Sequence, residues 1–198
     1  MKIGVLGTGQ VGSGIGRKLA SLGHDVMMGS REPARKAAAF AGMRVGTAVE
    51  AAAFGDWVIN ALPGETSLVS LRECAIDGKI LIDIGNYNSA VDQPIMEPLG
   101  QAIQREHPTT RVVKTLNSVS AHLMVDPGNL GRPHSVFIAS NDDAAKHDVS
   151  ALLRSFGWQD IVDLGDLSAC RAMEQLIPLW MSLEAKLGSP QFNLAVVR

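Results

Sequence analysis

Six residues near the amino terminus have the spacing that cradles phosphate groups. They are Gly7, Thr8, Gly9, Gln10, Val11 and Gly12, a G-x-G-x-x-G motif. The motif follows an apolar run and opens an amphipathic stretch, so the glycines allow a tight turn and close approach of a pyrophosphate to a helix N-terminus. Alone the motif is a weak signal, because glycine is common and kinases carry a similar string. Its position between a predicted strand and a predicted helix indicates a dinucleotide-binding turn.

Three side chains after the second predicted strand favour NADP over NAD. NAD-binding proteins place an Asp or Glu here, on the ribose hydroxyls. This chain has Ser30 and Arg31 instead. A hydroxyl and a guanidinium hold a 2′-phosphate through charge-assisted hydrogen bonds of about 1.5–3 kcal/mol each, whereas a carboxylate repels it. Arg35, one helical turn further on, is a second candidate for this clamp; the alternative is that both arginines are solvated surface charges.

Four loops at the expected carboxyl ends of strands are the places for the chemistry. They lie at 60–64, 85–88, 116–121 and 140–142, and their residues are small, polar and uncharged up to Asp142. Such linings suit a nicotinamide carboxamide and a second flat ring, and they lack the residue sets of a hydrolase. Hydride transfer between stacked rings needs proximity and orientation rather than a side-chain acid or base. The loop residues predicted to contact the cofactor include Ala61, Leu62, Pro63 and Asn86.

Two residues near these loops leave a different reaction open. Lys114 or His122 would serve as the acid of an NADPH reductase acting on a small carbonyl compound, although Lys114 precedes a strand end and favours a buried structural role. His122, on an apolar helix start, favours a packed or surface role. A third alternative is a non-catalytic NADPH-sensing module that presents a surface to a protein partner. The five histidines and two cysteines show no metal-ligand spacing.

Apolar runs alternate with helix-like segments along most of the chain, which is typical of a parallel sheet covered on both faces. The predicted fold class is therefore α/β, a doubly wound, mostly parallel Rossmann sheet with a short C-terminal helical extension. Strands are expected at 2–6, 25–28, 57–62, 80–84, 111–115, 135–139 and 161–164. Helices are expected at 10–22, 33–40, after a cap at Thr47, and at 67–74, 94–106, 142–156 and 167–187, the last bending or restarting near Pro178. Gly14 and Gly16 are expected to allow close packing of the first helix on the sheet.

The length of the chain and the apolar composition of its last residues predict the domain organisation. The 198 residues are expected to form one NADP-binding domain, of which 166–198 form a helical and extended appendage. This appendage carries more large apolar side chains than one exposed helix face can hold. It is predicted to cover the substrate side or a dimer interface, so we expect a homodimer.

Composition excludes several classes of partner. The chain is 46% hydrophobic and 19% charged with a net charge of -2, which is ordinary for a soluble enzyme and does not indicate nucleic acid or an anionic membrane. No apolar run approaches the ~18 residues of a membrane helix, and Met1-Lys2 leads directly into strand residues rather than a signal segment. We therefore expect a cytoplasmic protein whose Cys74 and Cys170 are reduced core thiols, each within a helix.

The chain resembles, essentially end to end, the NADPH-dependent reductases of the deazaflavin coenzyme F420 and the cytosolic NADPH domain of the six-transmembrane ferric reductases. The most specific segments are GTGQVG (7–12), GHDVMMGSR (23–31), NALP (60–63), VVKTLNSVSAH (112–122) and DLGDLSACRAMEQLIPLW (163–180).

The resemblance implies an oxidoreductase that transfers a hydride between NADP(H) and a flat acceptor such as coenzyme F420 or a flavin. It also implies that Thr8, Ser30, Arg31 and Arg35 contact the phosphates of NADP. Asn117 and Val119 would then lie beside the nicotinamide, and the second ring would stack near Pro63, Asn86 and Asn117. The archetypal deazaflavin reductases often carry histidine where this chain has Asn117, and this leaves the acceptor open.

Overall fold

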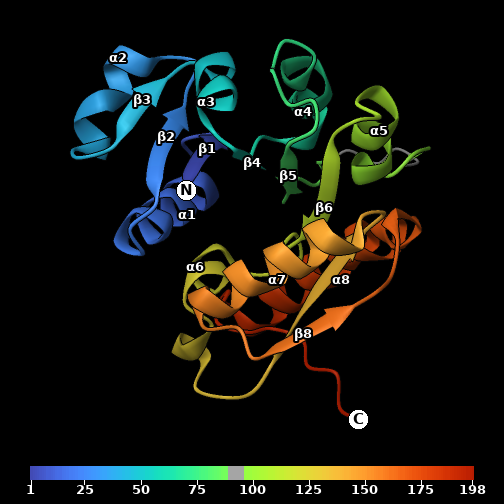
Figure 1. The fold of residues 1–198 in the computed structure, drawn as a ribbon. Helices are drawn as coiled ribbons and strands as arrows, with labels where there is room; N and C mark the ends of the chain where they lie inside the picture. The colour runs from blue at the N-terminus through green and yellow to red at the C-terminus, as the bar shows by residue number, and fades with distance from the viewer. Residues whose placement is uncertain (89–95) are drawn as a thin grey trace.

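The computed structural model describes residues 1–88 and 96–198 as an eight-stranded sheet covered by helices (Figure 1). The strand order is β3-β2-β1-β4-β5-β6-β7-β8, and each neighbouring pair is parallel except β6 and β7, which are antiparallel. The strands are β1 (Lys2–Leu6), β2 (Asp25–Gly29), β3 (Arg44–Gly46), β4 (Trp57–Asn60), β5 (Ile80–Asp83), β6 (Arg111–Thr115), β7 (Ser135–Ser140) and β8 (Asp160–Asp163). This confirms the predicted doubly wound class.

Eight α-helices and three 3₁₀ turns connect the strands of the described residues. The α-helices are α1 (Gln10–Ser21), α2 (Pro33–Lys36), α3 (Ala48–Phe54), α4 (Gly64–Leu71), α5 (Leu99–Glu106), α6 (Ala121–Val125), α7 (Asp143–Phe156) and α8 (Cys170–Leu187). The 3₁₀ turns are η1 (Ala37–Phe40), η2 (Pro127–Leu130) and η3 (Leu167–Ala169). The predicted Thr47 cap is confirmed: its side chain accepts from the Glu50 N–H, and Glu50 accepts from the Thr47 N–H.

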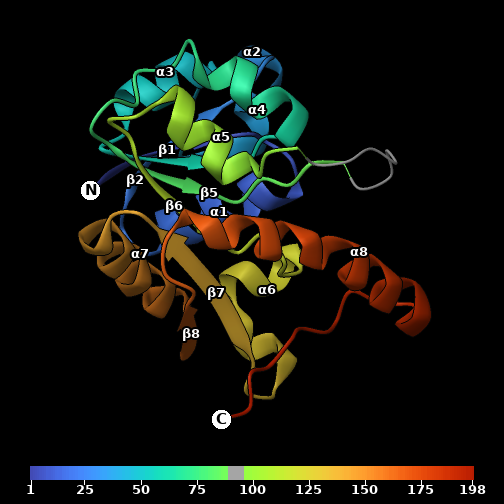
Figure 2. The same cartoon turned by 90° about the vertical axis from the view of Figure 1, so that its right-hand side faces the viewer.

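Helices cover both faces of the sheet, and the side chains of successive strand residues pack against alternate faces. Figure 2 shows α3, α4 and α5 on one side of the sheet and α1, α6 and α7 on the other. Ile59 and Ile82 belong to one hydrophobic cluster, whereas Val58 and Leu81 belong to the second. Because successive strand residues point to opposite faces, both faces of β4 and β5 are buried. The sheet is thus a rigid frame for the loops at its carboxyl edge.

Several predicted element bounds were wrong. The strand β3 was not predicted, because three residues are too short for a periodic pattern. The predicted helix 33–40 divides into α2 and η1. The helix predicted at 67–74 is α4, which begins at Gly64 and ends at Leu71. The predicted helix start at Pro94 lies outside the described residues. The last helix does not restart: α8 continues through the exposed Pro178, which has no N–H to donate to the helix.

Of the two glycines of α1 that were predicted to allow close packing on the sheet, only one does so. A Cβ on Gly16 would lie 2.4 Å from Sδ of Met28 in β2, so glycine is required for that approach. A Cβ on Gly14 would meet nothing within 4 Å. The prediction is therefore confirmed for Gly16 and wrong for Gly14, which lies on the side of α1 turned away from β2.

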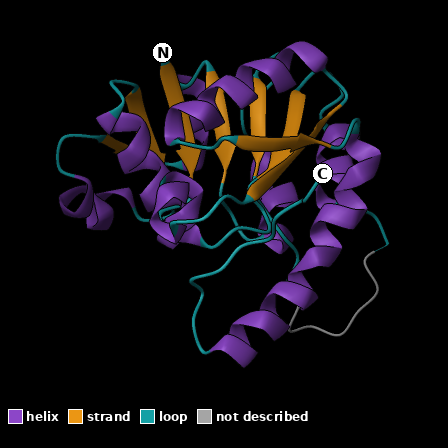
Figure 3. Ribbon diagram, turned by 90° about the horizontal axis from the view of Figure 1, so that it is seen from below, coloured by secondary structure: helices purple, strands orange, loops and turns teal. Residues whose placement is uncertain are grey.

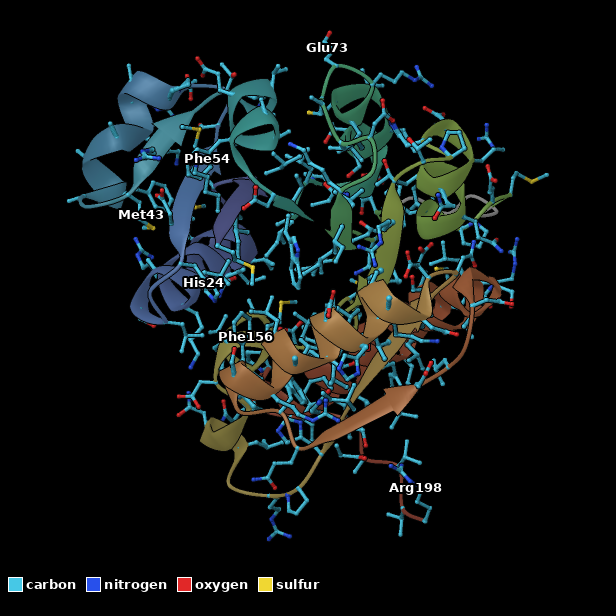
Figure 4. The ribbon with its side chains drawn as sticks, in the orientation of Figure 1. His24, Met43, Phe54, Glu73, Phe156 and Arg198 are labelled. Carbon is cyan, nitrogen blue, oxygen red and sulfur yellow. The ribbon has the colours of Figure 1, made fainter. Side chains whose placement is uncertain are left out.

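The appendage at the end of the chain has a buried root and an exposed end. In α8, Cys170, Met173 and Glu174 are buried, and beyond them the helix projects from the body of the protein (Figure 3). The tail returns along β7, where the Ser135 N–H donates to the Leu194 carbonyl, and it ends with Arg198 paired to Asp160 of β8 (Figure 4). None of the helices in the described ranges has the length and hydropathy to span a bilayer.

Candidate dinucleotide site

The glycine turn leaves open space for a ligand at the start of α1. Gly7 has φ +111°, a conformation that favours glycine, and a Cβ on Gly12 would lie 2.1 Å from the Gly7 carbonyl oxygen. A Cβ on Gly9 would meet nothing within 4 Å. The first N–H groups of α1 have no partner within the helix, and neither a capping side chain nor an acidic residue occupies its first turn. This end of α1 therefore fits a pyrophosphate.

The residues that were predicted to select NADP lie at the end of β2, beside this turn. The Gly7 N–H donates to the Gly29 carbonyl across the two strand ends. Ser30 is buried, and its Oγ accepts from the Glu32 N–H, whereas Arg31 is exposed. Arg35 forms an exposed ion pair with Glu32 (3.1 Å). Such surface pairs contribute about 0–1 kcal/mol, so a phosphate dianion can compete for Arg35.

A hydrogen-bonded network joins the carboxyl ends of β4 and β5. The Asn60 Nδ2 donates to Asp83 Oδ1 (2.9 Å) and Ser67 Oγ (3.1 Å). The Gly64 N–H donates to the Asn86 carbonyl (3.0 Å), and a Cβ on Gly64 would lie 2.5 Å from that oxygen. The loops containing Ala61, Leu62, Pro63 and Asn86 are therefore brought together, as the sheet topology predicts.

The loop after β7 is not part of this site, contrary to the prediction. Because β7 runs antiparallel to β6, residues 140–142 lie at the opposite edge of the sheet. There Asp142 binds Arg111, the first residue of β6, at 2.6 Å. Arg111 lowers the pKa of Asp142 to about 2 by hydrogen bonding, aided by the Ala145 N–H. The Pro/Gly-rich stretch at 126–133, where no long crossover helix is predicted, was the signal that could have indicated the reversal of direction.

Lys114 lies in a buried ionic cluster rather than in a reactive position. Its Nζ is 2.8 Å from Asp83 Oδ2, 2.9 Å from Glu174 Oε1 and 2.6 Å from the Gly85 carbonyl, and the side chain has no exposed surface. Burial lowers the pKa of Lys114, but the charges of Asp83 and Glu174 outweigh it and raise the pKa above its ordinary value. The three N–H donors are all used, which favours the structural role predicted for Lys114.

Glu174 also binds the start of α5. Its two carboxylate oxygens accept from the N–H groups of Leu99 (2.9 Å) and Gly100 (3.2 Å). A carboxylate is favoured there by the positive end of the helix. Sequence reasoning missed both Asp83 and Glu174; the only signal was a charged residue within otherwise apolar stretches. The cluster fixes α8 over the ends of β5 and β6.

Asn117 and Asn86 face each other above this cluster. The Asn86 Nδ2 donates to the Asn117 carbonyl (2.7 Å), and the Asn117 Nδ2 donates to Asn86 Oδ1 (3.1 Å) and to the Met173 carbonyl (2.9 Å). Leu116, just before them, has φ +61°, the only positive φ among described residues other than glycine. Such a conformation costs about 1–3 kcal/mol and is typical of functional sites.

The other predicted residues beyond β6 have structural partners. Val119 is buried and packs in the hydrophobic core, and its N–H donates to the Leu116 carbonyl. His122 Nε2 lies 2.6 Å from Gln191 Oε1, and Ser120 Oγ donates to the Pro190 carbonyl. The C-terminal tail thus holds the loop after β6. No group of His, Cys, Asp and Glu within the described ranges is arranged to hold a metal ion.

Both cysteines lie in the core, as predicted, but only Cys170 lies in a helix. Cys74 and Cys170 are free and buried. Burial raises the pKa of the Cys170 thiol to about 12, so it stays protonated. Cys74 lies in the turn after α4, and its thiol donates to the Ser70 carbonyl.

The fold and the site together define a dinucleotide-binding protein of the Rossmann class. Residues 2–87 match the family model described as NADP oxidoreductase, coenzyme F420-dependent. The F420-dependent NADP reductase of Methanothermobacter marburgensis is 30% identical, over 94% of this chain and 93% of that protein. A crystal structure of a candidate F420-dependent NADP reductase from Arthrobacter sp. FB24 is 40% identical, covers both chains completely and has a TM-score of 0.93. The chain belongs to the family of coenzyme F420-dependent NADP oxidoreductases.

The second predicted resemblance is also confirmed. Rat metalloreductase STEAP3 is 30% identical over 90% of this chain, which spans 38% of the length of that protein.

Proposed function

We propose that this chain binds NADP(H) across the carboxyl edge of its sheet and transfers a hydride between it and a flat deazaflavin or flavin-like acceptor such as coenzyme F420. The observation that carries the proposal is the open phosphate turn beside Ser30 and Arg31, in a chain with a full-length relative named as an F420-dependent NADP reductase. The cofactor residues are Gly7, Thr8, Gly9, Gln10, Val11, Gly12, Ser30, Arg31, Arg35, Ala61, Leu62, Pro63, Asn86, Asn117 and Val119.

The side chains at this edge bind and orient rather than exchange protons. When bound, NADPH supplies the hydride from its nicotinamide ring. Lys114 is enclosed by its ion pairs and His122 is bound to the tail. Tyr87 is the one titratable side chain in the loops at 60–64, 85–88 and 116–121; it packs against the second hydrophobic cluster, where burial raises the pKa of its phenol. The ion pairs of Lys114 and the tail contact of His122 favour ring-to-ring transfer over reduction of a small carbonyl compound with either of these two residues as its acid.

The direct test is an absorbance assay of NADPH oxidation with coenzyme F420, FMN, FAD and riboflavin as separate acceptors. We expect turnover with at least one of these rings. Absence of NADPH oxidation with all four at high protein concentration would contradict the proposal. Tight NADPH binding without turnover, with an NADPH-dependent change in oligomer size, would support the sensing module instead.

The NADP preference is tested at Arg31. Arg31→Ala should weaken NADPH binding by about one to two orders of magnitude and leave NADH binding nearly unchanged, because only the 2′-phosphate loses a partner. Arg132→Ala, which removes an exposed arginine between η2 and β7, is the matched control. Calorimetric titration measures both ligands, and equal losses for NADPH and NADH would refute the assignment.

We further propose that residues 1–198 act as one NADP-binding domain that pairs with a second copy through the appendage at 166–198. Leu179 is 50% exposed and Leu187 is 59% exposed on the projecting part of α8. Exposed apolar side chains on one helix favour association. Light scattering after gel filtration should give the mass of a dimer, and Leu179→Glu should give a monomer with an unchanged circular dichroism spectrum.

A further inference from the structure

The C-terminal tail, residues 189–198, is bound to the start of β7 by hydrogen bonds. None of its residues is buried, and it forms neither helix nor strand. The Ser135 N–H donates to the Leu194 carbonyl, and the Val196 N–H donates to Ser135 Oγ (2.9 Å). The Asn193 Nδ2 donates to the Ser135 carbonyl (2.9 Å) and to His134 Nδ1 (2.6 Å). The position of the tail therefore depends on a few polar contacts rather than on a buried apolar face.

The hydrogen bonds of His134 determine where its single proton lies. The Nε2 atom is 2.9 Å from the Pro127 carbonyl, which can only accept, so Nε2 carries the proton. The Nδ1 atom faces the Asn193 Nδ2, which can only donate, so Nδ1 must be unprotonated. The Asn193 amide cannot be turned over, because its oxygen would then face the Ser135 carbonyl. The bound tail thus requires a neutral imidazole in one tautomer.

The surroundings of His134 offer no substitute acceptor for a second proton. The side chain is 8% exposed, and the edge of its ring packs against Trp158 at 4.9 Å. The nearest carboxylate on the neighbouring strand, Asp160, is already bound by Ser135 Oγ and by Arg198. The charged groups before and between η2 and β7, all of them exposed, are Asp126 and Arg132. A proton on Nδ1 would therefore set two donors against each other and bury an unpaired charge.

His122 also contacts the tail, but it tolerates a second proton. The Gln191 Nε2 donates to the Asn129 carbonyl (2.9 Å), so Gln191 Oε1 faces His122 Nε2 (2.6 Å) and accepts from it. A second proton on His122 would add to Nδ1 and leave this hydrogen bond in place. The two histidines at the tail thus respond to acid in different ways.

We propose that His134 is a pH-sensitive latch for the C-terminal tail: the neutral imidazole binds Asn193, and protonation of Nδ1 releases the tail. The bound state excludes a proton that the free imidazole accepts, so binding of the tail weakens as pH falls. Release also frees Ser120, whose Oγ donates to the Pro190 carbonyl. Ser120 belongs to the loop after β6, so an effect of the latch on the cofactor site rests on the function proposed above, whereas the latch itself does not.

The test is amide hydrogen exchange of the full chain, without nucleotide, between about pH 8 and pH 5, the range in which histidine side chains are protonated. The Ser135 and Val196 amides are informative, because their hydrogen bonds exist only while the tail is bound. Their protection factors should fall as pH falls, by up to about tenfold per pH unit, while that of Val5 in the central strand β1 does not. Protection that did not change with pH, or an equal fall at Val5, would overturn the inference.

Substitutions then identify the histidine that is responsible. In His134→Asn the side-chain oxygen can accept from Asn193 but does not titrate, so the protection of Ser135 and Val196 should not change with pH. His134→Gln, which also does not titrate, serves if that variant does not fold. His122→Gln keeps an N–H donor toward Gln191 and is the matched control, in which the fall should remain. A fall that persisted without His134, or that disappeared in His122→Gln, would refute the latch. Because no nucleotide is used, this outcome is independent of the NADPH oxidation assay.

Discussion

Replacing Lys114 with methionine tests the buried ionic cluster. The change keeps most of the side-chain volume but removes the charge that Asp83 and Glu174 share, at 2.8 and 2.9 Å. Asp83 keeps its bonds from Asn60 and the Gly85 N–H, and Glu174 keeps those from Leu99 and Gly100. Asp83 and Glu174 are then left in the core without the cation that pairs them, and removing one partner of a buried ion pair costs about 3–5 kcal/mol.

The loss should be visible in thermal unfolding and should depend on pH. For a domain of this size, about 3–5 kcal/mol corresponds to a fall of about 6–20 °C in Tm. In the unmodified protein, the charges of Asp83 and Glu174 raise the pKa of Lys114 above its ordinary value, so at high pH the folded state binds more protons than the unfolded state. Its stability then falls as pH rises. The difference between Lys114→Met and the unmodified protein should therefore be large at neutral pH and shrink as pH rises above 10.5.

Two further variants separate this effect from general damage. Arg105→Met removes one partner of an exposed pair with Glu97 and should cost less than about 1 kcal/mol. Lys114→Met combined with Glu174→Gln should recover part of the lost Tm, because one uncompensated charge is gone. Circular dichroism between about pH 7 and pH 11 measures all of them. A loss for Lys114→Met that matched Arg105→Met, or that did not change with pH, would refute the reasoning.

Two further predictions concern stability. Gly14→Ala should stabilise the protein by about 0.5–1 kcal/mol, since a Cβ there meets nothing within 4 Å, whereas Gly16→Ala should destabilise it by about 1–3 kcal/mol through contact with Met28; urea unfolding that ranked them equally would contradict this. Arg111 lowers the pKa of Asp142 from 3.8 to about 2. The ionised Asp142 carboxylate therefore stabilises the folded state above pH 3.8, and this contribution is lost as pH falls toward 2. Asp142→Asn should thus lower Tm at neutral pH and flatten acid unfolding in that range, and an unchanged acid profile would refute it.

Local sequence determined the phosphate turn and the class of fold. The spacing from Gly7 to Gly12, the residues Ser30 and Arg31, and the alternation of apolar runs with helical segments depend on neighbours only a few positions apart. Local geometry dictates them, because a glycine turn and a strand-helix junction are set by their own residues. The family could also be recognised at this level, from segments such as 112–122.

The tertiary structure alone decided which residues meet. The reversal of β7 places residues 140–142 at the far edge of the sheet, because β7 pairs antiparallel with β6. Asp83 and Glu174 reach Lys114 only because parallel strands and α8 bring distant segments together. The neutral form of His134 likewise follows from the Pro127 carbonyl and Asn193, which come from other segments. Pairing of buried charges and amides depends on distances between elements, which the periodicity of a single segment does not contain.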